Sequence, residues 1–342
     1  MHYSNCFPFS LYNHLFPSTI MTNRQVILHW YPQSPFAQKV AWALLYKKVD
    51  FKIVLITPIE PRPLRRPLDG GYRKTPILQI GNHTFCDSKI IFAELEQRFP
   101  EPSFYPKDTD GVSSENLIKG LARWTDSSLF SLVASQIQMG ALGKEFLEDR
   151  SKFAGRKIDP EKLKFTIPFM NQSLKAEIKI AERFVSERNK NGELWALGTN
   201  SLSLLDLNFA MITWFVKSLI GKDWINANVP VLGHHLEKTL KAVDAGKLKK
   251  IEAISPEEAL KVAKEQSFGL SNATHDGSLN IQLGKLVSIS PTDSGIIPSI
   301  GVLVHSTVNE TVIEHKEEKY GFTSYTHFPV VGFVVLPQVS KL

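Results

Sequence analysis

The chain has 342 residues, of which 43% are hydrophobic and 22% are charged, a composition typical of globular proteins with two or three domains. Its net charge of +6 is too small to indicate nucleic-acid binding by itself, and no apolar run approaches the ~20 residues that a membrane-spanning helix needs. The two cysteines, Cys6 and Cys86, are too few for a disulfide framework or a four-cysteine zinc site, and they favour a reducing, cytoplasmic location.

Residues 1–23 precede the first organised segment. The first twenty residues contain no Lys or Arg and no continuous apolar centre, so a secretory signal peptide is not expected. We expect residues 1–23 to be a flexible N-terminal extension.

The pattern of residues 24–102 predicts an α/β domain. Two short apolar runs, at 26–31 and 51–56, are typical of buried strands, and an amphipathic helix begins at Pro35 between them. Strand, helix and strand predict a parallel pair with a right-handed crossover. Two further β-like runs flank Gly81-Asn82, which predicts a hairpin, and a helix beginning at Ser88 follows. The order β-α-β-β-β-α is that of a thioredoxin-like domain.

Residues 103–268 carry the pattern of an all-helical bundle. Long helices are expected at 114–137 and 160–188. The segment 203–220 is apolar nearly all round, which is typical of the buried central helix of a bundle. It begins with a capping-box pattern at Ser203, which strengthens the prediction that a helix starts there.

The composition changes after residue 268. Residues 269–342 carry Gly, Ser and Thr among alternating Val and Ile, which predicts a separate small all-β module, a barrel or a sandwich. Its five expected strands lie at 285–290, 299–306, 311–315, 323–328 and 332–337.

Two hydroxyls stand at the first strand–helix junction. Ser34 directly precedes Pro35, at a helix start whose unpaired amides and positive dipole favour an anion. Ser34 can equally be a simple helix cap, since Ser and Pro are common at these positions. Tyr31 ends the strand three residues earlier and is either a second reactive hydroxyl or a packing residue.

Two other motifs lie in the same domain. Pro76 stands at the entrance to a strand, where a cis Thr75–Pro76 bond would make a sharp turn. Asp87 and Ser88 begin the last helix, where an acid and a hydroxyl can hold an ammonium and a carboxylate side by side, or can simply cap the helix.

Taken together, these motifs resemble the cytosolic glutathione transferases. The matching segments are WYPQSPFAQKV, RKTPIL, CDSKIIFAELEQRFP and ALGTNSLSLLDLNFA, and the resemblance covers about residues 24–250. With the tail segment THFPVVGFVVLP, the chain is similar to fungal glutathione-transferase-like proteins that carry an extra C-terminal β domain.

The resemblance implies that glutathione is the co-substrate. The Thr75 backbone would pair with its cysteinyl part beside a cis Pro76, and Asp87 and Ser88 would hold its γ-glutamyl end. Ser34 would donate a hydrogen bond to the sulfur and so favour the thiolate, which is the nucleophile.

Tyr31 is the rival to Ser34 for this role, because other branches of the family use a tyrosine near the end of the first strand. A serine at position 34 argues against disulfide exchange, which needs a thiolate there. The remaining thiol, Cys86, is expected to be a small buried hydrophobe.

The resemblance further implies conjugation of glutathione to a hydrophobic electrophilic small molecule, in detoxification or secondary metabolism, by a homodimer without a metal. Trp124 and Phe130 fall where the family places acceptor-site residues, although a core role is at least as well supported. The alternative is a non-catalytic binding or assembly module that uses the β domain to recognise a partner. No nucleic-acid or membrane partner is expected.

A basic cluster lies in the long loop between the second strand and Thr75. We expect it to be a solvated loop rather than a docking site for an acidic partner. Its members are Arg62, Arg65, Arg66, Arg73 and Lys74.

Overall fold

The computed structural model describes residues 24–107, 111–188 and 194–338, so the expected N-terminal extension, residues 1–23, lies outside the described part of the chain. The predicted β-α-β-β-β-α order of the first domain is confirmed, with one short helix added. The elements are β1 (Val26–Trp30), α1 (Pro35–Tyr46), β2 (Phe51–Leu55), α2 (Arg66–Asp69), β3 (Ile77–Ile80), β4 (His83–Cys86) and α3 (Ser88–Arg98).

The first four strands pair as the sequence predicts. Strand β1 is parallel to β2 and antiparallel to β3, so the crossover through α1 joins a parallel pair. Strands β3 and β4 form the hairpin around Gly81-Asn82, with Ile80 opposite His83. Gly81 has a φ of +57°, a backbone conformation that glycine adopts without steric cost.

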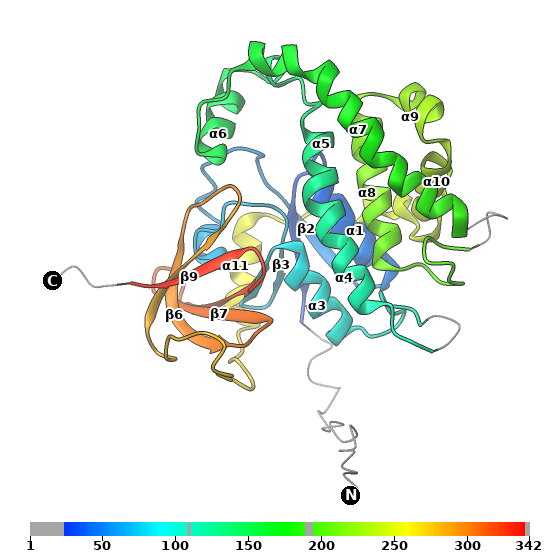
Figure 1. Ribbon diagram of the computed structural model, residues 1–342. Helices are drawn as coiled ribbons and strands as arrows, with labels where there is room; N and C mark the ends of the chain where they lie inside the picture. The colour runs from blue at the N-terminus through cyan, green and yellow to red at the C-terminus, as the bar shows by residue number, and fades with distance from the viewer. Residues whose placement is uncertain (1–23, 108–110, 189–193, 339–342) are drawn as a thin grey trace, which may run out of the picture.

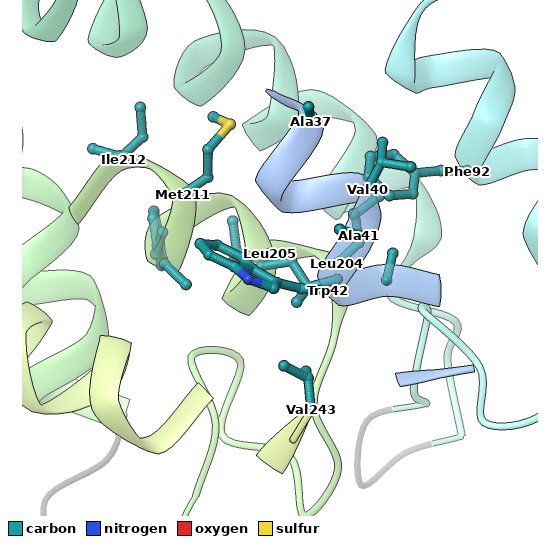
Figure 2. Close-up of a cluster of buried hydrophobic side chains, with 14 of the residues drawn as sticks. Ala37, Val40, Ala41, Trp42, Phe92, Leu204, Leu205, Met211, Ile212 and Val243 are labelled. Carbon is teal, nitrogen blue, oxygen red and sulfur yellow. The ribbon is translucent and has the colours of Figure 1, made fainter. Parts of the chain in front are cut away.

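One face of this sheet packs against α1 and α3, and α1 in turn packs against the helical region. Figure 2 shows Trp42 of α1 among apolar side chains of the helix that follows Ser203, including Leu205 and Met211. The Trp42 indole also makes an edge-to-face contact with Trp214, with ring centroids 6.4 Å apart. This shared core joins the first domain to the helical one.

The helical region is built around a buried helix, as predicted. Helix α8 (Leu204–Leu219) is buried along most of its length, and Asp206 accepts a 2.8 Å hydrogen bond from the Ser203 N–H at its start. The other elements of the region are α4 (Glu115–Arg123), the π-helical segment η1 (Trp124–Leu129), α5 (Phe130–Ala134), the 3₁₀ turn η2 (Met139–Leu142), α6 (Lys144–Ala154), α7 (Pro160–Arg188), α9 (Lys222–Asn228), α10 (Pro230–Ala242) and the 3₁₀ turn η3 (Ala245–Lys250). None of the described helices is long and apolar enough to cross a membrane.

The five expected C-terminal strands are present and form the expected all-β region, which is joined to the sheet of the first domain. Strand β8 pairs in parallel with β4, so the described strands form one continuous sheet in the order β2-β1-β3-β4-β8-β7-β6-β5-β9. Figure 1 shows the C-terminal strands β6, β7 and β9 beside the first domain. Without β8, the edge of β4 would present unpaired N–H and C=O groups. The C-terminal elements are β5 (Leu286–Pro291), β6 (Ser299–Ser306), β7 (Glu310–Glu317), β8 (Phe322–Pro329) and β9 (Phe333–Pro337).

The other face of the first sheet is covered by α11 (Pro256–Glu265), a helix that follows η3 in the chain. Its Ala259 and Leu260 belong to a small core with Ile27 and Val54 of the sheet. The side chain of Gln79 on β3 donates a 2.9 Å hydrogen bond to the carbonyl of Ala259. The chain after the helical bundle therefore returns to complete the first domain on both its face and its edge.

Candidate active site

A cavity of about 440 Å³ lies where the first domain, the helical region and the C-terminal strands meet. All six residues that the sequence predicts as site residues line it. They are Tyr31, Ser34, Thr75, Pro76, Asp87 and Ser88. Residues that are up to fifty-seven positions apart in the sequence are thus brought to one place by the pairing of β1, β3 and β4.

Ser34 is the N-cap of α1, and only 4% of its surface is exposed. Its Oγ accepts a 3.3 Å hydrogen bond from the Ala37 N–H, and no described residue accepts the hydroxyl proton. The Ser34 N–H donates to the Tyr31 carbonyl at 3.1 Å, which closes the turn between β1 and α1. The cap and the reactive hydroxyl of the sequence analysis are therefore compatible, because the cap uses a lone pair and leaves the proton to a ligand.

Thr75 and Pro76 are joined by a cis peptide bond, as the sequence suggests. The ladder between β1 and β3 begins at Ile77, so Thr75 lies just outside it, at the rim of the cavity. The Thr75 hydroxyl accepts a 3.2 Å hydrogen bond from the buried Arg65 guanidinium, which fixes the turn. An extended ligand can pair with backbone groups at this position as a further strand would.

Asp87 is the N-cap of α3 and has a φ of +89°, which is uncommon for a residue with a side chain. Its Oδ1 accepts a 2.9 Å hydrogen bond from the Lys89 N–H and lies 3.3 Å from the Lys89 ammonium. Ser88, the first residue of the helix, is buried beside it. The junction presents a carboxylate, a hydroxyl and a helix N-terminus to the cavity, three groups that suit an α-amino-acid head.

The basic loop is folded, not solvated, which corrects the expectation from composition. Arg62, Arg65 and Arg73 are each at most 5% exposed. Arg62 donates to three backbone carbonyls, and Arg73 holds the carboxylate of Asp149 with contacts of 2.6 and 2.7 Å. The partner carboxylate comes from α6, far along the chain, so the sequence of the loop gave no sign of it.

Five cations and three carboxylates line the cavity, and two further carboxylates, Glu60 and Asp149, pair with lining arginines. The lining cations are Arg62, Arg73, Lys74, Lys89 and Arg150, against the carboxylates of Asp87, Asp126 and Asp293. Burial lowers the pKa of Arg62 to about 9, with Arg65 and Arg73 acting in the same direction and Glu60 opposing them. Arg62 therefore stays charged at neutral pH and lies 3.3 Å from the Glu60 carboxylate.

The helical region supplies a further wall. Phe130 lines the cavity, with Phe36 of α1 at a ring-centroid distance of 4.7 Å. Trp124 does not line it; its indole N–H donates to Glu177 at 2.5 Å and its ring packs on Phe209. Of the two residues expected at the acceptor site, Phe130 lines the cavity and Trp124 packs in the core.

Sequence reasoning missed several lining residues that come from distant segments. Asp126 and Ser127 lie in the π-helical segment η1, Arg150 and Phe153 in α6, and Asp293 and Ser294 in the loop between β5 and β6. The π-helical geometry around Asp126 and Ser127 is frequent at functional sites, but it is seen only in the structure, and the sequence offers no local signal for the other lining residues.

The thiol of Cys86 is fully buried in a small apolar core, and burial raises its pKa well above the ordinary value. Such a thiol is held neutral and is not a nucleophile. Among the described residues, no group of three or more His, Cys, Asp or Glu side chains is arranged to hold a metal ion.

Comparison with known proteins agrees with this geometry. Residues 28–103 match the family of glutathione S-transferase N-terminal domains. A probable glutathione S-transferase of Solanum tuberosum is 31% identical over 75 residues, and a probable maleylacetoacetate isomerase 1 of Drosophila melanogaster is 34% identical over 93 residues. These matches cover 22% and 24% of this chain, and the chain spans about a third of the length of each relative, 35% in both cases.

A solved structure of a GST-like protein from Pseudomonas syringae resembles almost the whole chain. It superposes with a TM-score of 0.66 at 26% identity, and the match covers 92% of this chain and 99% of that one. The first domain is therefore of the glutathione S-transferase N-terminal type, and the described fold is shared with a GST-like protein.

Proposed function

We propose that the protein is a glutathione transferase-like enzyme, which joins the glutathione thiolate to a hydrophobic electrophilic small molecule. The observation that carries the proposal is the convergence of three junctions on one cavity. Ser34 offers a hydroxyl at the N-terminus of α1, Thr75 an extended backbone beside a cis proline, and Asp87-Ser88 a polar helix start. These are the groups that a thiol, a peptide backbone and an α-amino-acid head require.

The mixed charges of the cavity wall suit a peptide ligand that carries charges of both signs. Glutathione carries two carboxylates and one ammonium, and it gains a further negative charge when its thiol ionises. The cavity wall offers lysine and arginine side chains to these carboxylates and aspartate side chains to the ammonium.

In the proposed mechanism, Ser34 stabilises the thiolate and does not remove its proton, because a serine hydroxyl is not a base at neutral pH. A free thiol has a pKa near ~8.5, and a donated hydrogen bond with a helix N-terminus favours its ionised form. The thiol proton passes to solvent, and the thiolate sulfur attacks the electrophilic carbon. A C–S bond forms while the bond from that carbon to its leaving group breaks, and the leaving group departs with the bonding electron pair. Phe36 and Phe130 provide an aromatic wall against which an apolar electrophile can pack.

The alternative, a non-catalytic binding or assembly module, has one observation in its favour. The C-terminal region exposes several apolar side chains, among them Ile296, Ile297, Ile300 and Leu336. A protein of this kind binds glutathione without turnover, or does not bind it at all.

Calorimetric titration with glutathione tests the proposal. The wild type is expected to bind, and the double variant Asp87→Asn/Ser88→Ala to bind at least about tenfold more weakly, because it loses an ionic and a hydroxyl contact. Asn is chosen at position 87 because it keeps the helix cap and tolerates the positive φ. A wild type that binds no glutathione would end the hypothesis; binding with no conjugation of any tested electrophile would favour the alternative.

A further inference from the structure

One wall of the cavity comes from the C-terminal region. Asp293 and Ser294 belong to the loop between β5 and β6, which reaches towards α6 in Figure 1. The same cavity is lined by the three junctions of the first domain. The C-terminal region therefore does more than extend the sheet, because its loop between β5 and β6 borders the proposed binding site.

Two contacts hold this loop in place. The Asp293 carboxylate lies 2.5 Å from the ammonium of Lys74, which directly precedes Thr75. The Gly295 N–H donates to the Phe153 carbonyl of α6 at 2.8 Å. Gly295 has a φ of +63°, and a Cβ at this position would lie 2.7 Å from the Phe153 ring, so only glycine fits.

The loop lies at the end of the cavity that contains Asp87. The Thr292 N–H donates to the Gly332 carbonyl at 3.0 Å, and a Cβ on Gly332 would lie 3.9 Å from the Lys89 ammonium. The loop and the start of α3 therefore face one another across one end of the cavity.

Two ion pairs frame this end, Asp87–Lys89 and Asp293–Lys74, with contacts of 3.3 and 2.5 Å. A pair of opposite charges is complementary to a zwitterion, since its acid accepts from an ammonium while its lysine donates to a carboxylate. An α-amino-acid head carries both groups on one carbon. The end of the cavity is thus suited to such a head.

We propose that the Asp293-Ser294 loop completes the site for the γ-glutamyl head of the ligand, opposite Asp87 and Ser88. This inference rests on the proposed function, because it assigns one end of the same cavity. It gives the C-terminal region a role in ligand recognition within its own chain.

Calorimetric titration with two peptides tests this role. Glutathione carries the γ-glutamyl head, and cysteinylglycine lacks it. Asp293→Asn removes the carboxylate charge, and Gly295→Val displaces the loop through Phe153. Both variants are expected to bind glutathione about tenfold more weakly and cysteinylglycine as the wild type does. Glu318→Gln, an exposed charge loss in the turn after β7, serves as the matched control and is expected to change neither affinity.

The outcomes separate this inference from the proposed function. If the wild type binds glutathione and both loop variants bind it equally well, the loop has no role and the proposed function stands. If both variants lose affinity for the two peptides alike, the assignment to the γ-glutamyl head is wrong. If the wild type binds no glutathione, the proposed function and this inference both fail. A selective loss in Asp293→Asn supports the inference even where Gly295→Val fails to fold.

Discussion

The ammonium of Lys39 lies 2.7 Å from the carboxylate of Asp126 and joins α1 of the first domain to the π-helical segment η1 of the helical region. Lys39 is fully buried, and its third contact is the side-chain oxygen of Asn208 on α8 at 3.0 Å. Burial lowers the pKa of Lys39, while the charge of Asp126 opposes this shift. The pair thus fixes how the two domains meet at the wall of the cavity.

Breaking this buried pair is expected to destabilise the fold strongly. Lys39→Met leaves Asp126 without its partner, and the expected loss is roughly 3–5 kcal/mol in the free energy of unfolding. The double variant Lys39→Met/Asp126→Leu removes both charges and should recover most of this loss. Urea unfolding measures both variants.

An exposed ion pair provides the control. Lys52 lies 2.9 Å from Glu252 with side chains 31% and 64% exposed, so Lys52→Met should cost at most about 1 kcal/mol. A Lys39→Met variant as stable as Lys52→Met would show that the buried pair contributes little.

Conjugation kinetics can show whether the hydroxyl of Ser34 or that of Tyr31 stabilises the thiolate. A hydrogen bond to a charged group contributes roughly 1.5–3 kcal/mol, so Ser34→Ala is expected to lower kcat/KM about 10- to 100-fold. Ser34→Thr keeps the hydroxyl and should retain most of the activity. Tyr31→Phe is expected to behave as the wild type, and a loss confined to Tyr31→Phe would reverse the assignment.

Stability separates the cap from the chemistry in the same variants. Ser34→Ala also removes the N-cap of α1, which should cost about 1 kcal/mol of unfolding free energy. If Ser34→Ala remains fully folded at the assay temperature, loss of the N-cap alone cannot explain a 10-fold or larger fall in rate. A fall in the folded fraction that matches the fall in rate would leave Ser34 as a cap only.

Local signals explain which parts of the site the sequence could predict. Ser34, Thr75-Pro76 and Asp87-Ser88 each stand at the start of a helix or strand, where the residue type itself indicates the junction. The thioredoxin-like order then brings these junctions to one edge. The candidate site and the fold of the first domain could therefore be predicted from short segments of the sequence.

Distant partners explain what the sequence could not predict. Asp293 is 219 positions from Lys74, and Asp149 is 76 positions from Arg73. The pairing of β8 with β4 leaves both strands with ordinary alternating patterns, so a separate β module and a joined sheet look alike in sequence. The prediction that the basic loop is solvated was wrong for the same reason, because charge composition does not show where the acids that pair with its arginines lie.

The buried side-chain amide of Asn82, directly before β4, connects the first domain to the C-terminal region. Asn82 donates 3.1 and 2.7 Å hydrogen bonds to the carbonyls of Phe268 and Thr323, and it accepts a 2.9 Å bond from the Phe268 N–H. Asn82→Ala leaves these backbone groups without their partner, and the expected cost is roughly 3 kcal/mol. Asn280→Ala, at an exposed position, should change stability by less than about 0.5 kcal/mol.

Urea unfolding followed by tryptophan fluorescence and by circular dichroism measures this effect. Because the sheet is continuous, both probes should report a single transition that Asn82→Ala moves to lower urea. Two separate transitions in the wild type would mean that the C-terminal strands unfold independently.

Acid sensitivity is expected from a buried histidine on strand β1 of the first sheet. His29 shares a 2.8 Å hydrogen bond with Gln79, and its pKa is lowered to about 4, mainly by burial and further by Arg65, against the raising effect of Gln79. The unfolded chain binds a proton at this residue below pH ~6.5, whereas the folded chain binds it only near pH 4. Stability is therefore lost as the pH falls through this window, by about 2 kcal/mol between pH ~7 and ~5 from this residue alone.

The variant His29→Gln isolates this contribution, because glutamine can still hydrogen-bond to Gln79 and does not titrate. Its unfolding free energy at neutral pH is expected to be lower than that of the wild type, since the replacement packs less well. Its further loss on acidification should be smaller than that of the wild type by about 2 kcal/mol. Urea unfolding at both pH values measures the difference, and equal losses in the two proteins would show that His29 does not govern the acid response.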